Sequence, residues 1–213
     1  MFALNIRSKL QKEYNVDFEH QRGSGGLGLR WKLFDGVDKK TASKVTVLMF
    51  SKKDLPKSMR KDNDRFVCLL RKEVERGTKF KHPHCLRVIK PMVEVRGEVA
   101  FVAERVKCSL SDILGDSACD AIPAELARFK FGALQLRAGL AQLCDAALFM
   151  HCDAQMAHGN ISPSTVYVTE RGDWKLVRSL SLSLSLQNDR YIHSLPFCAR
   201  IFGLKMFFCF FAV

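Results

Sequence analysis

The sequence His158-Gly159-Asn160-Ile161-Ser162-Pro163 lies between a long helix pattern and two short strand patterns. Before it, apolar residues recur at alternating steps of four and three between residues 124 and 151, which predicts one buried helical face. They are Phe129, Ala133, Leu136, Leu140, Leu143, Ala147 and Met150. After it, Val166–Val168 and Trp174–Val177 flank the turn 171–173 (Arg-Gly-Asp) and predict a pair of strands. A long helix, a polar loop and a hairpin therefore follow one another.

A glycine-rich segment at residues 23–28 satisfies the pattern G-x-G-x-x-G. Glycines at this spacing occur in dinucleotide-binding turns, in loops that cover phosphates and in plain hairpins. A dinucleotide-binding turn opens into a helix. Residues 29–34 instead alternate with a period of about two, which predicts a strand. The pattern therefore favours a glycine-rich hairpin.

Other strand and helix patterns lie between these segments. The runs Val45–Phe50 and Val99–Glu104 are apolar and partly β-branched, as buried strands are. Residues 65–76 predict a helix, and a short helix should begin at Ser109. The strands gather in the first half of the chain and the long helix lies in the second. We therefore predict an α+β fold.

In order and spacing, these motifs resemble those of a protein kinase. A kinase has His-Arg-Asp in the catalytic loop, and its Asp accepts the proton of the hydroxyl that is phosphorylated. Asn160 takes that position here, and an amide cannot accept the proton. The resemblance implies a protein-kinase-like fold with a complete β-rich N-lobe at 15–107 and a partial helical C-lobe at 108–178. Residues 179–213 would form a non-homologous tail.

The resemblance places replaced residues at four more positions of kinase chemistry. Leu48 takes the position of the phosphate-pairing Lys. Ser162 and Thr165 replace the loop Lys and the metal-binding Asn, and Arg178 replaces the metal-binding Asp. Losing a general base lowers a rate by about 10²- to 10⁴-fold, and losing a charge stabiliser by about 10²- to 10³-fold. We expect no catalytic residue, no metal ligand and no detectable phosphoryl transfer.

The resemblance also names positions for a nucleotide, in the glycine-rich loop and in the segment that joins the lobes. They are Gly23, Gly25, Gly26, Gly28, Ala103, Glu104 and Val106. Adenine can stack between apolar strands, and glycine N–H groups can meet phosphates. Arg178 would repel magnesium. We therefore expect that no cofactor is required, and that any ATP binding is weak and independent of magnesium.

Two further residues have structural roles in this comparison. Glu73 precedes His82-Pro83 by nine residues, as the helix Glu that pairs with the kinase Lys does. With Leu48 opposite, we expect Glu73 to face solvent or to pair with an arginine such as Arg178, unless it is an ordinary exposed charge. In a kinase the histidine equivalent to His158 braces the catalytic loop, and we expect the same role.

Three features resemble the Scy-like pseudokinases, above all their coated-vesicle-associated branch. They are the loop His-Gly-Asn-Ile-x-Pro, the run 25–36 (Gly-Gly-Leu-Gly-Leu-Arg-Trp-Lys-Leu-Phe-Asp-Gly) and a Trp-Lys-Leu strand without Asp-Phe-Gly after it. In that family a helical-repeat region and a tail follow the kinase-like domain, and its members are linked to clathrin-dependent and endosome-to-Golgi traffic. The resemblance implies a cytoplasmic scaffold, peripheral on Golgi or endosomal membranes, with vesicle-coat or SNARE-related protein partners. An atypical active kinase is the alternative.

The positive charge is unevenly distributed. Residues 1–107 contain 25 Lys and Arg against 13 Asp and Glu, whereas the remaining residues contain nine of each. Such an excess suits an anionic partner, so a basic adaptor for membranes or nucleic acid is another alternative. The basic residues are scattered and no basic-aromatic platform is evident. A solvated basic face is therefore expected, and an anionic membrane is favoured over nucleic acid.

The remaining features concern the cysteines and the two ends of the sequence. None of the eight cysteines forms a Cys-x-x-Cys pair, so buried reduced thiols are expected. Residues 1–14 lack the continuous apolar core of a secretory signal. Residues 180–186 alternate Leu and Ser, and the apolar stretch 201–213 is shorter than the roughly 20 residues of a membrane span. We interpret 179–213 as intron read-through or a shifted reading frame that truncates the domain.

Overall fold

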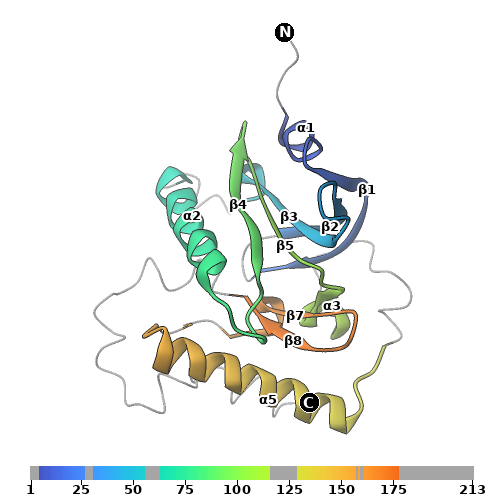
Figure 1. The fold of residues 1–213 in the computed structure, drawn as a ribbon, viewed down its shortest axis with the longest axis vertical. Coiled ribbons are helices and arrows are strands. Elements are labelled where there is room, and N and C mark those ends of the chain that lie inside the picture. The colour runs from blue at the N-terminus through green and yellow to red at the C-terminus, as the bar shows by residue number, and fades with distance from the viewer. Residues whose placement is uncertain are drawn as a thin grey trace.

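The computed structural model describes residues 5–26, 31–55, 63–115, 129–156, 158 and 161–177. They form an N-lobe built on a five-stranded sheet and a C-lobe in which a small sheet lies on a long helix (Figure 1). The elements in chain order are α1 (Ile6–Leu10), β1 (Tyr14–Gly25), β2 (Trp31–Asp38), β3 (Lys44–Ser51), η1 (Lys52–Asp54), α2 (Asn63–Lys79), β4 (Val88–Val95), β5 (Glu98–Glu104), β6 (Cys108–Ser109), α3 (Leu110–Ile113), α5 (Ala133–Leu148), η3 (Phe149–Asp153), η4 (Pro163–Thr165), β7 (Val166–Val168) and β8 (Trp174–Leu176). The predicted α+β class is confirmed.

The N-lobe sheet is antiparallel with the strand order β1-β2-β3-β5-β4. Its central strands, β3 and β5, are the two apolar runs predicted from the sequence. Residues 45–50 of β3 are buried without exception, because this strand is covered on both faces. The edge strand β4 carries Pro91, which a central strand would not tolerate since proline lacks an N–H.

The outer face of this sheet is covered by α1. Asn5 caps the helix through its side chain, and Ile6 and Leu10, four residues apart, point inward and are fully buried. They pack with Phe34 and Val47 of the sheet. A lobe boundary at residue 15 leaves out α1, although this helix belongs to the same hydrophobic core.

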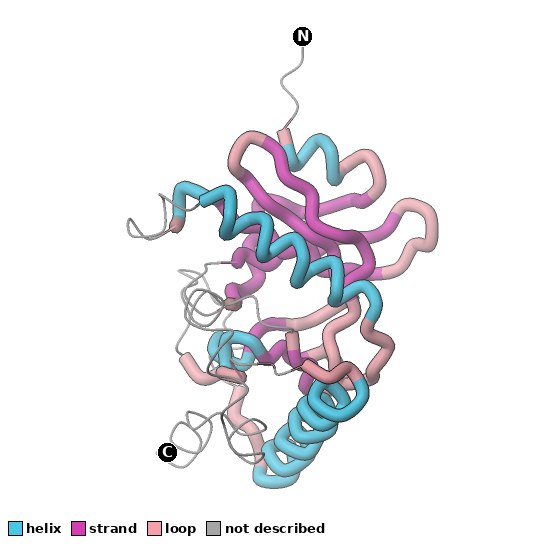
Figure 2. Tube along the Cα trace, turned by 90° about the vertical axis from the view of Figure 1, so that its left-hand side faces the viewer, coloured by secondary structure: helices cyan, strands magenta, loops and turns pink. Residues whose placement is uncertain are grey.

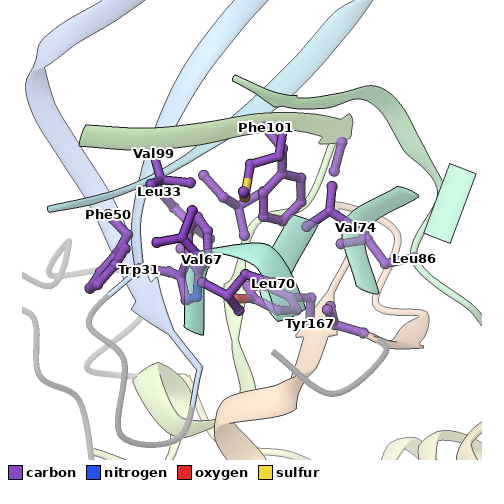
Figure 3. Packing of buried hydrophobic residues seen from close by; sticks show 14 of the residues in the cluster. Trp31, Leu33, Phe50, Val67, Leu70, Val74, Leu86, Val99, Phe101 and Tyr167 are labelled. Carbon is purple, nitrogen blue, oxygen red and sulfur yellow. The ribbon is translucent and has the colours of Figure 1, made fainter. Parts of the chain in front are cut away.

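The inner face of the sheet packs against α2, which crosses it diagonally (Figure 2). Phe66, Val67, Leu70 and Val74 follow the three- and four-residue spacing of one helical face, and all four are buried. They meet Phe50, Val99 and Phe101 in the cluster that Figure 3 shows. The helix predicted over 65–76 is confirmed, with a few more residues at each end.

The C-lobe helix α5 begins later than predicted and presents a different face to the core. Leu143 and Met150 are buried as expected, but Ala133 and Leu136 are exposed. The buried face passes through Gly139, which packs directly against the indole of Trp174 in β8. A glycine contributes nothing to a hydrophobic pattern. The buried face predicted from the apolar residues is therefore rotated about the helix axis relative to the observed one.

Backbone hydrogen bonds join the two lobes along β8. The N–H of Leu86 donates to the carbonyl of Leu176 at 2.9 Å, and the N–H of Leu176 donates to the carbonyl of His84 at 2.8 Å. Within the described ranges, no helix has the length and apolar character needed to cross a membrane. The predicted tail 179–213 lies outside these ranges, as do Gly28, Asn160 and Arg178.

Candidate functional site

Between the lobes, where the sequence placed a nucleotide, lies the side chain of Tyr167. Tyr167 of β7 reaches up from the C-lobe and is fully buried in the N-lobe cluster that contains Trp31, Leu48 and Ala103 (Figure 3). A β-carbon built on Gly25 would overlap the Tyr167 hydroxyl, so only glycine allows this contact. Burial, and next the nearby Asp112 carboxylate, raise the pKa of Tyr167. The phenol therefore stays neutral.

The glycine-rich strand end is hydrogen-bonded to the C-lobe. The backbone N–H and the hydroxyl of Ser24 both donate to the buried carboxylate of Asp112, each at 3.1 Å. The same carboxylate accepts the N–H of Ser109 at 3.1 Å, which caps α3. The N–H of Gly26 donates to the carbonyl of Ser164 at 2.8 Å. This segment, which we call the latch (residues 23–26), is thus closed onto the C-lobe.

The segment that joins the lobes has its polar backbone groups occupied at Val106. The N–H of Val106 donates to the hydroxyl oxygen of Thr46 at 3.0 Å, and that hydroxyl donates to the carbonyl of Val106 at 3.3 Å. Thr46 is buried near the start of β3, opposite Ala103. The backbone N–H and carbonyl of Val106, one of the predicted adenine positions, are therefore already paired within the protein.

Ion pairs fix the joining segment on both sides. The carboxylate of Glu104 accepts two hydrogen bonds of 3.0 Å from Lys175 of β8. Arg105 donates to Asp35 of the N-lobe and, at 2.9 Å, to Glu170 in the turn between β7 and β8. The hydrogen bond from Arg105 lowers the pKa of the Glu170 carboxyl. These pairs cross from one lobe to the other and hold their orientation.

The two residues at the positions of the kinase Lys and helix Glu do not form an ion pair with each other, because Leu48 carries no charge. Leu48 is fully buried in the inner cluster, with no charge to offer a phosphate. Glu73 is on α2 and accepts a hydrogen bond from Arg76, one turn later, at 2.9 Å. Glu73 thus pairs with an arginine, Arg76, as one of the expected alternatives has it; Arg178 lies outside the described residues.

The catalytic-loop positions form a local hydrogen-bond network. The ring Nε2 of His158 lies 2.6 Å from the carbonyl oxygen of Val177, so Nε2 carries the proton and donates. The N–H of Ser162 donates to the hydroxyl of Thr165 at 3.0 Å, and this hydroxyl donates back to the carbonyl of Ser162 at 3.0 Å. His158 therefore ties the loop to the end of β8, while Ser162 and Thr165 shape the turn that leads into β7.

Three of the predicted nucleotide positions, Gly23, Gly25 and Gly26, lie in the latch, and Ala103 and Val106 lie in the cluster that contains Tyr167. Gly25 contacts Tyr167, whereas the Glu104 side chain pairs with Lys175. Among the described residues, no group of three or more His, Cys, Asp or Glu side chains could hold a metal ion.

Three residues that shape the site were missed from the sequence. Thr46 is the one polar residue in the apolar run 45–50, and Tyr167 carries a hydroxyl between two valines. Each is only a weak sequence signal for a role in the site. Asp112 is part of the short helix that Ser109 caps, and capping alone accounts for an aspartate there. Its second role, bonding Ser24 across 88 positions of sequence, appears only in three dimensions.

The described cysteines differ in exposure. Cys85 and Cys108 are buried, Cys144 is half-buried, and Cys68 and Cys152 are exposed; all five are free thiols. The expectation that the cysteines are buried holds for Cys85 and Cys108, and is wrong for Cys68 and Cys152. Desolvation raises the pKa of both Cys85 and Cys108 to about 12.

Alkylation at pH 8 should therefore distinguish the cysteines. A thiol of pKa about 12 has roughly one molecule in 10⁴ as the reactive thiolate at that pH, and burial also blocks the reagent. We expect iodoacetamide followed by peptide mass spectrometry to label Cys68 and Cys152 in the native protein, and Cys85 and Cys108 only after unfolding. Equal labelling rates in the native protein would contradict the burial of Cys85 and Cys108.

Comparison with known proteins agrees with the geometry. SCY1-like protein 2 of Mus musculus is 33% identical over 156 residues, which cover 72% of this chain and 17% of that protein. The human protein of the same name gives the same figures. The chain belongs to the Scy-like family of protein-kinase-like proteins.

Other comparisons extend this assignment. The protein kinase domain-containing protein ppk32 of Schizosaccharomyces pombe is 28% identical over 202 residues, which cover 89% of this chain and 27% of that protein. This Scy-like chain therefore spans about a sixth to a quarter of the length of these relatives. No protein-family model matches the sequence.

A solved structure confirms the kinase-like fold. The crystal structure of Rad53 residues 1–466 in complex with AMP-PNP aligns with a TM-score of 0.53 at 17% identity, over 80% of this chain and 39% of that one. At this identity the likeness establishes the fold alone.

Proposed function

We propose that this Scy-like chain is a pseudokinase module, which keeps the kinase fold as a scaffold and transfers no phosphoryl group. The observation that carries the proposal is the closed space between the lobes. Tyr167 fills it from the C-lobe, and Thr46 occupies both backbone hydrogen-bonding groups of Val106. A nucleotide would have to displace a fully buried ring and break two internal hydrogen bonds.

The sequence supports the same proposal, because the side chains that phosphoryl transfer requires are replaced. Leu48 offers no ammonium, Asn160 no carboxylate, and Arg178 a positive charge where a metal ligand is required. Each replacement lowers a phosphoryl-transfer rate by roughly two to four orders of magnitude, although such losses are not additive. Transfer should therefore be undetectable, and no cofactor is required.

We propose further that nucleotide binding, where it is measured, is weak and independent of magnesium. For a dissociation constant above about 1 mM, 1 mM ATP stabilises the folded state by less than about 0.4 kcal/mol. The melting temperature should then rise by less than about 3 °C, and added magnesium should not increase the shift. Thermal-shift titration and transfer of radiolabelled phosphate to a generic substrate measure the two parts separately. Tight, magnesium-dependent stabilisation would contradict the proposal.

The proposed setting is membrane traffic, in the coated-vesicle-associated branch of the family. Kinship with SCY1-like protein 2 supports this, since the Scy-like family is linked to clathrin-dependent and endosome-to-Golgi traffic. The chain would be cytoplasmic and peripheral on Golgi or endosomal membranes, with vesicle-coat or SNARE-related partners. Proximity labelling in cells should enrich coat components above the level of a free labelling enzyme. If coat components were labelled no more than by the free labelling enzyme, this part of the proposal would be wrong.

A further inference from the structure

Most carboxylates of the N-lobe are already paired with a basic side chain. Glu13 lies 2.5 Å from Lys90, and Glu94 lies 2.6 Å from Lys52. Asp35 and Glu104 are paired with basic residues in the same way. The excess positive charge of the N-lobe is therefore carried by the basic side chains that form no ion pair, and their positions show where it lies.

Six such residues gather at one end of the N-lobe: on α1, in the turn that follows it, in the turn that joins β2 to β3 and at the first residue of β3. We call this set the basic tip: Arg7, Lys9, Lys12, Lys39, Lys40 and Lys44. All six are exposed, and none lies within 4.0 Å of a carboxylate among the residues that the structure describes. Burial of Ile6 and Leu10 turns the basic side of α1 outward.

The two parts of the basic tip are held together by the fold. Tyr14 pairs with Asp38 where β1 meets β2, and the N–H of Lys39 donates to the carbonyl of Glu13 at 3.0 Å. The Lys39 ammonium also donates to the carbonyl of Gln11 at 2.5 Å. The turn thus lies against the end of α1, and the six charges form one surface.

Two carboxylates near this surface already have a basic partner. Glu13 is paired with Lys90, and Asp17 with His20 at 2.9 Å. Asp38 accepts the backbone N–H of Lys40 at 2.8 Å, and this bond lowers the pKa of its carboxyl. The carboxylate of Asp38 therefore shapes the turn and keeps its negative charge beside Lys40, as Glu170 does beside Lys44, so these two offset only part of the six positive charges.

We infer that the basic tip docks on the surface of an anionic lipid bilayer. Five of its six basic residues are lysines, which act as point charges on a diffuse anionic surface and lack the planar fork of arginine. The neighbouring aromatic rings are not free to stack on bases: Tyr14 is buried, and the guanidinium of Arg7 lies over Phe18 at 5.3 Å. Clusters of four to eight basic residues are typical of surfaces that bind anionic lipids.

This inference deepens the proposed membrane role and takes its cellular setting from it. It does not depend on the loss of phosphoryl transfer, because the basic tip is exposed while the closed space between the lobes is buried. A failure of vesicle binding would leave the nucleotide measurements unchanged, so the two proposals can fail separately.

The experiment compares two variants of the full chain that lose the same charge. Lys9→Gln, Lys12→Gln and Lys40→Gln together remove half of the basic tip. Arg65→Gln, Lys72→Gln and Lys79→Gln remove three exposed charges from α2 as the matched control. Binding is measured by sedimentation with vesicles of phosphatidylcholine containing 30% phosphatidylserine, and with pure phosphatidylcholine.

We expect the wild-type chain to bind the phosphatidylserine vesicles and not the neutral ones. Each basic residue near an anionic bilayer contributes roughly fivefold to binding, so the tip variant should lose about 100-fold. The α2 variant should stay within about fivefold of the wild type, because charges beyond the Debye length of about 8 Å are screened. Thermal melting of both variants shows that they fold.

Several results would overturn the inference. Equal losses in the two variants would mean that net charge, and not the basic tip, determines binding. No binding of the wild-type chain, or equal binding to neutral vesicles, would exclude docking driven by anionic lipid. Retention on single-stranded DNA that exceeds vesicle binding and is lost in the tip variant would assign the surface to nucleic acid instead.

Discussion

Gly139→Ala should destabilise the protein by at least about 2 kcal/mol, although alanine is the better helix former. Gly139 lies in the middle of α5, and a β-carbon built there would overlap the six-membered ring of Trp174. Trp174 is only 1% exposed and cannot swing away. The helix would therefore have to move off β8, and the cost of overpacking exceeds the gain in helix propensity. Urea denaturation followed by circular dichroism measures the change.

Ala141→Gly on the same helix is the control that measures how much helix propensity alone changes the free energy of unfolding. Position 141 is exposed, so this substitution should cost about 1 kcal/mol through helix propensity alone. A stabilising effect of about 1 kcal/mol from Gly139→Ala, equal and opposite to the control, would show that α5 and β8 are not in close contact. That result would also remove the explanation for the displaced buried face of α5.

The sequence predicted best those elements whose signals are local. The apolar runs of β3 and β5, the strand pair β7 and β8, and the capped start of α3 at Ser109 are each marked within a few residues. Several elements were not predicted, among them α1 and β4. The helix α1 is only five residues long, and β4 lacks a regular alternation and contains Pro91. Both are stabilised by the sheet they pack on, which a local pattern does not report.

The sequence predicted which residues occupy the kinase positions of the candidate site, but not the contacts that close the site. The degenerate positions follow from comparison with kinase motifs, so Leu48 and Thr165 could be named from the sequence. The closure of the site depends on contacts between distant residues: Ser24 with Asp112, and Thr46 with Val106. Such pairs have no spacing rule, because the fold and not the local chain brings them together.

Tyr167→Ala should cost about 3–5 kcal/mol, the range for removal of a fully buried aromatic ring. The ring is completely enclosed between the lobes, so the surrounding side chains cannot close the space without moving one lobe against the other. Chemical denaturation would measure the loss. A cost below about 1 kcal/mol would mean that the ring fills little space, and the proposed reason for excluding nucleotides would fall with it.

Tyr167→Phe separates the ring from its hydroxyl. In the part of the chain that the structure describes, the hydroxyl oxygen is buried and has no hydrogen-bond partner. An unpaired buried polar group costs about 1–3 kcal/mol, so its removal should leave stability unchanged or raise it. Destabilisation by Tyr167→Phe would reveal a bridging water or another partner.

The emptied space in Tyr167→Ala should also accept a small aromatic molecule. A cavity in a cluster that contains Trp31 and Leu48 is apolar, and dry apolar cavities bind aromatic rings of matching size. Phenol should therefore raise the melting temperature of Tyr167→Ala and leave that of Tyr167→Phe unchanged. ATP should restore much less stability than phenol, because Leu48 supplies no charge for its phosphates and Thr46 still occupies Val106. A variant that bound ATP as well as phenol would show that Tyr167 alone, and not the loss of polar contacts, excludes the nucleotide.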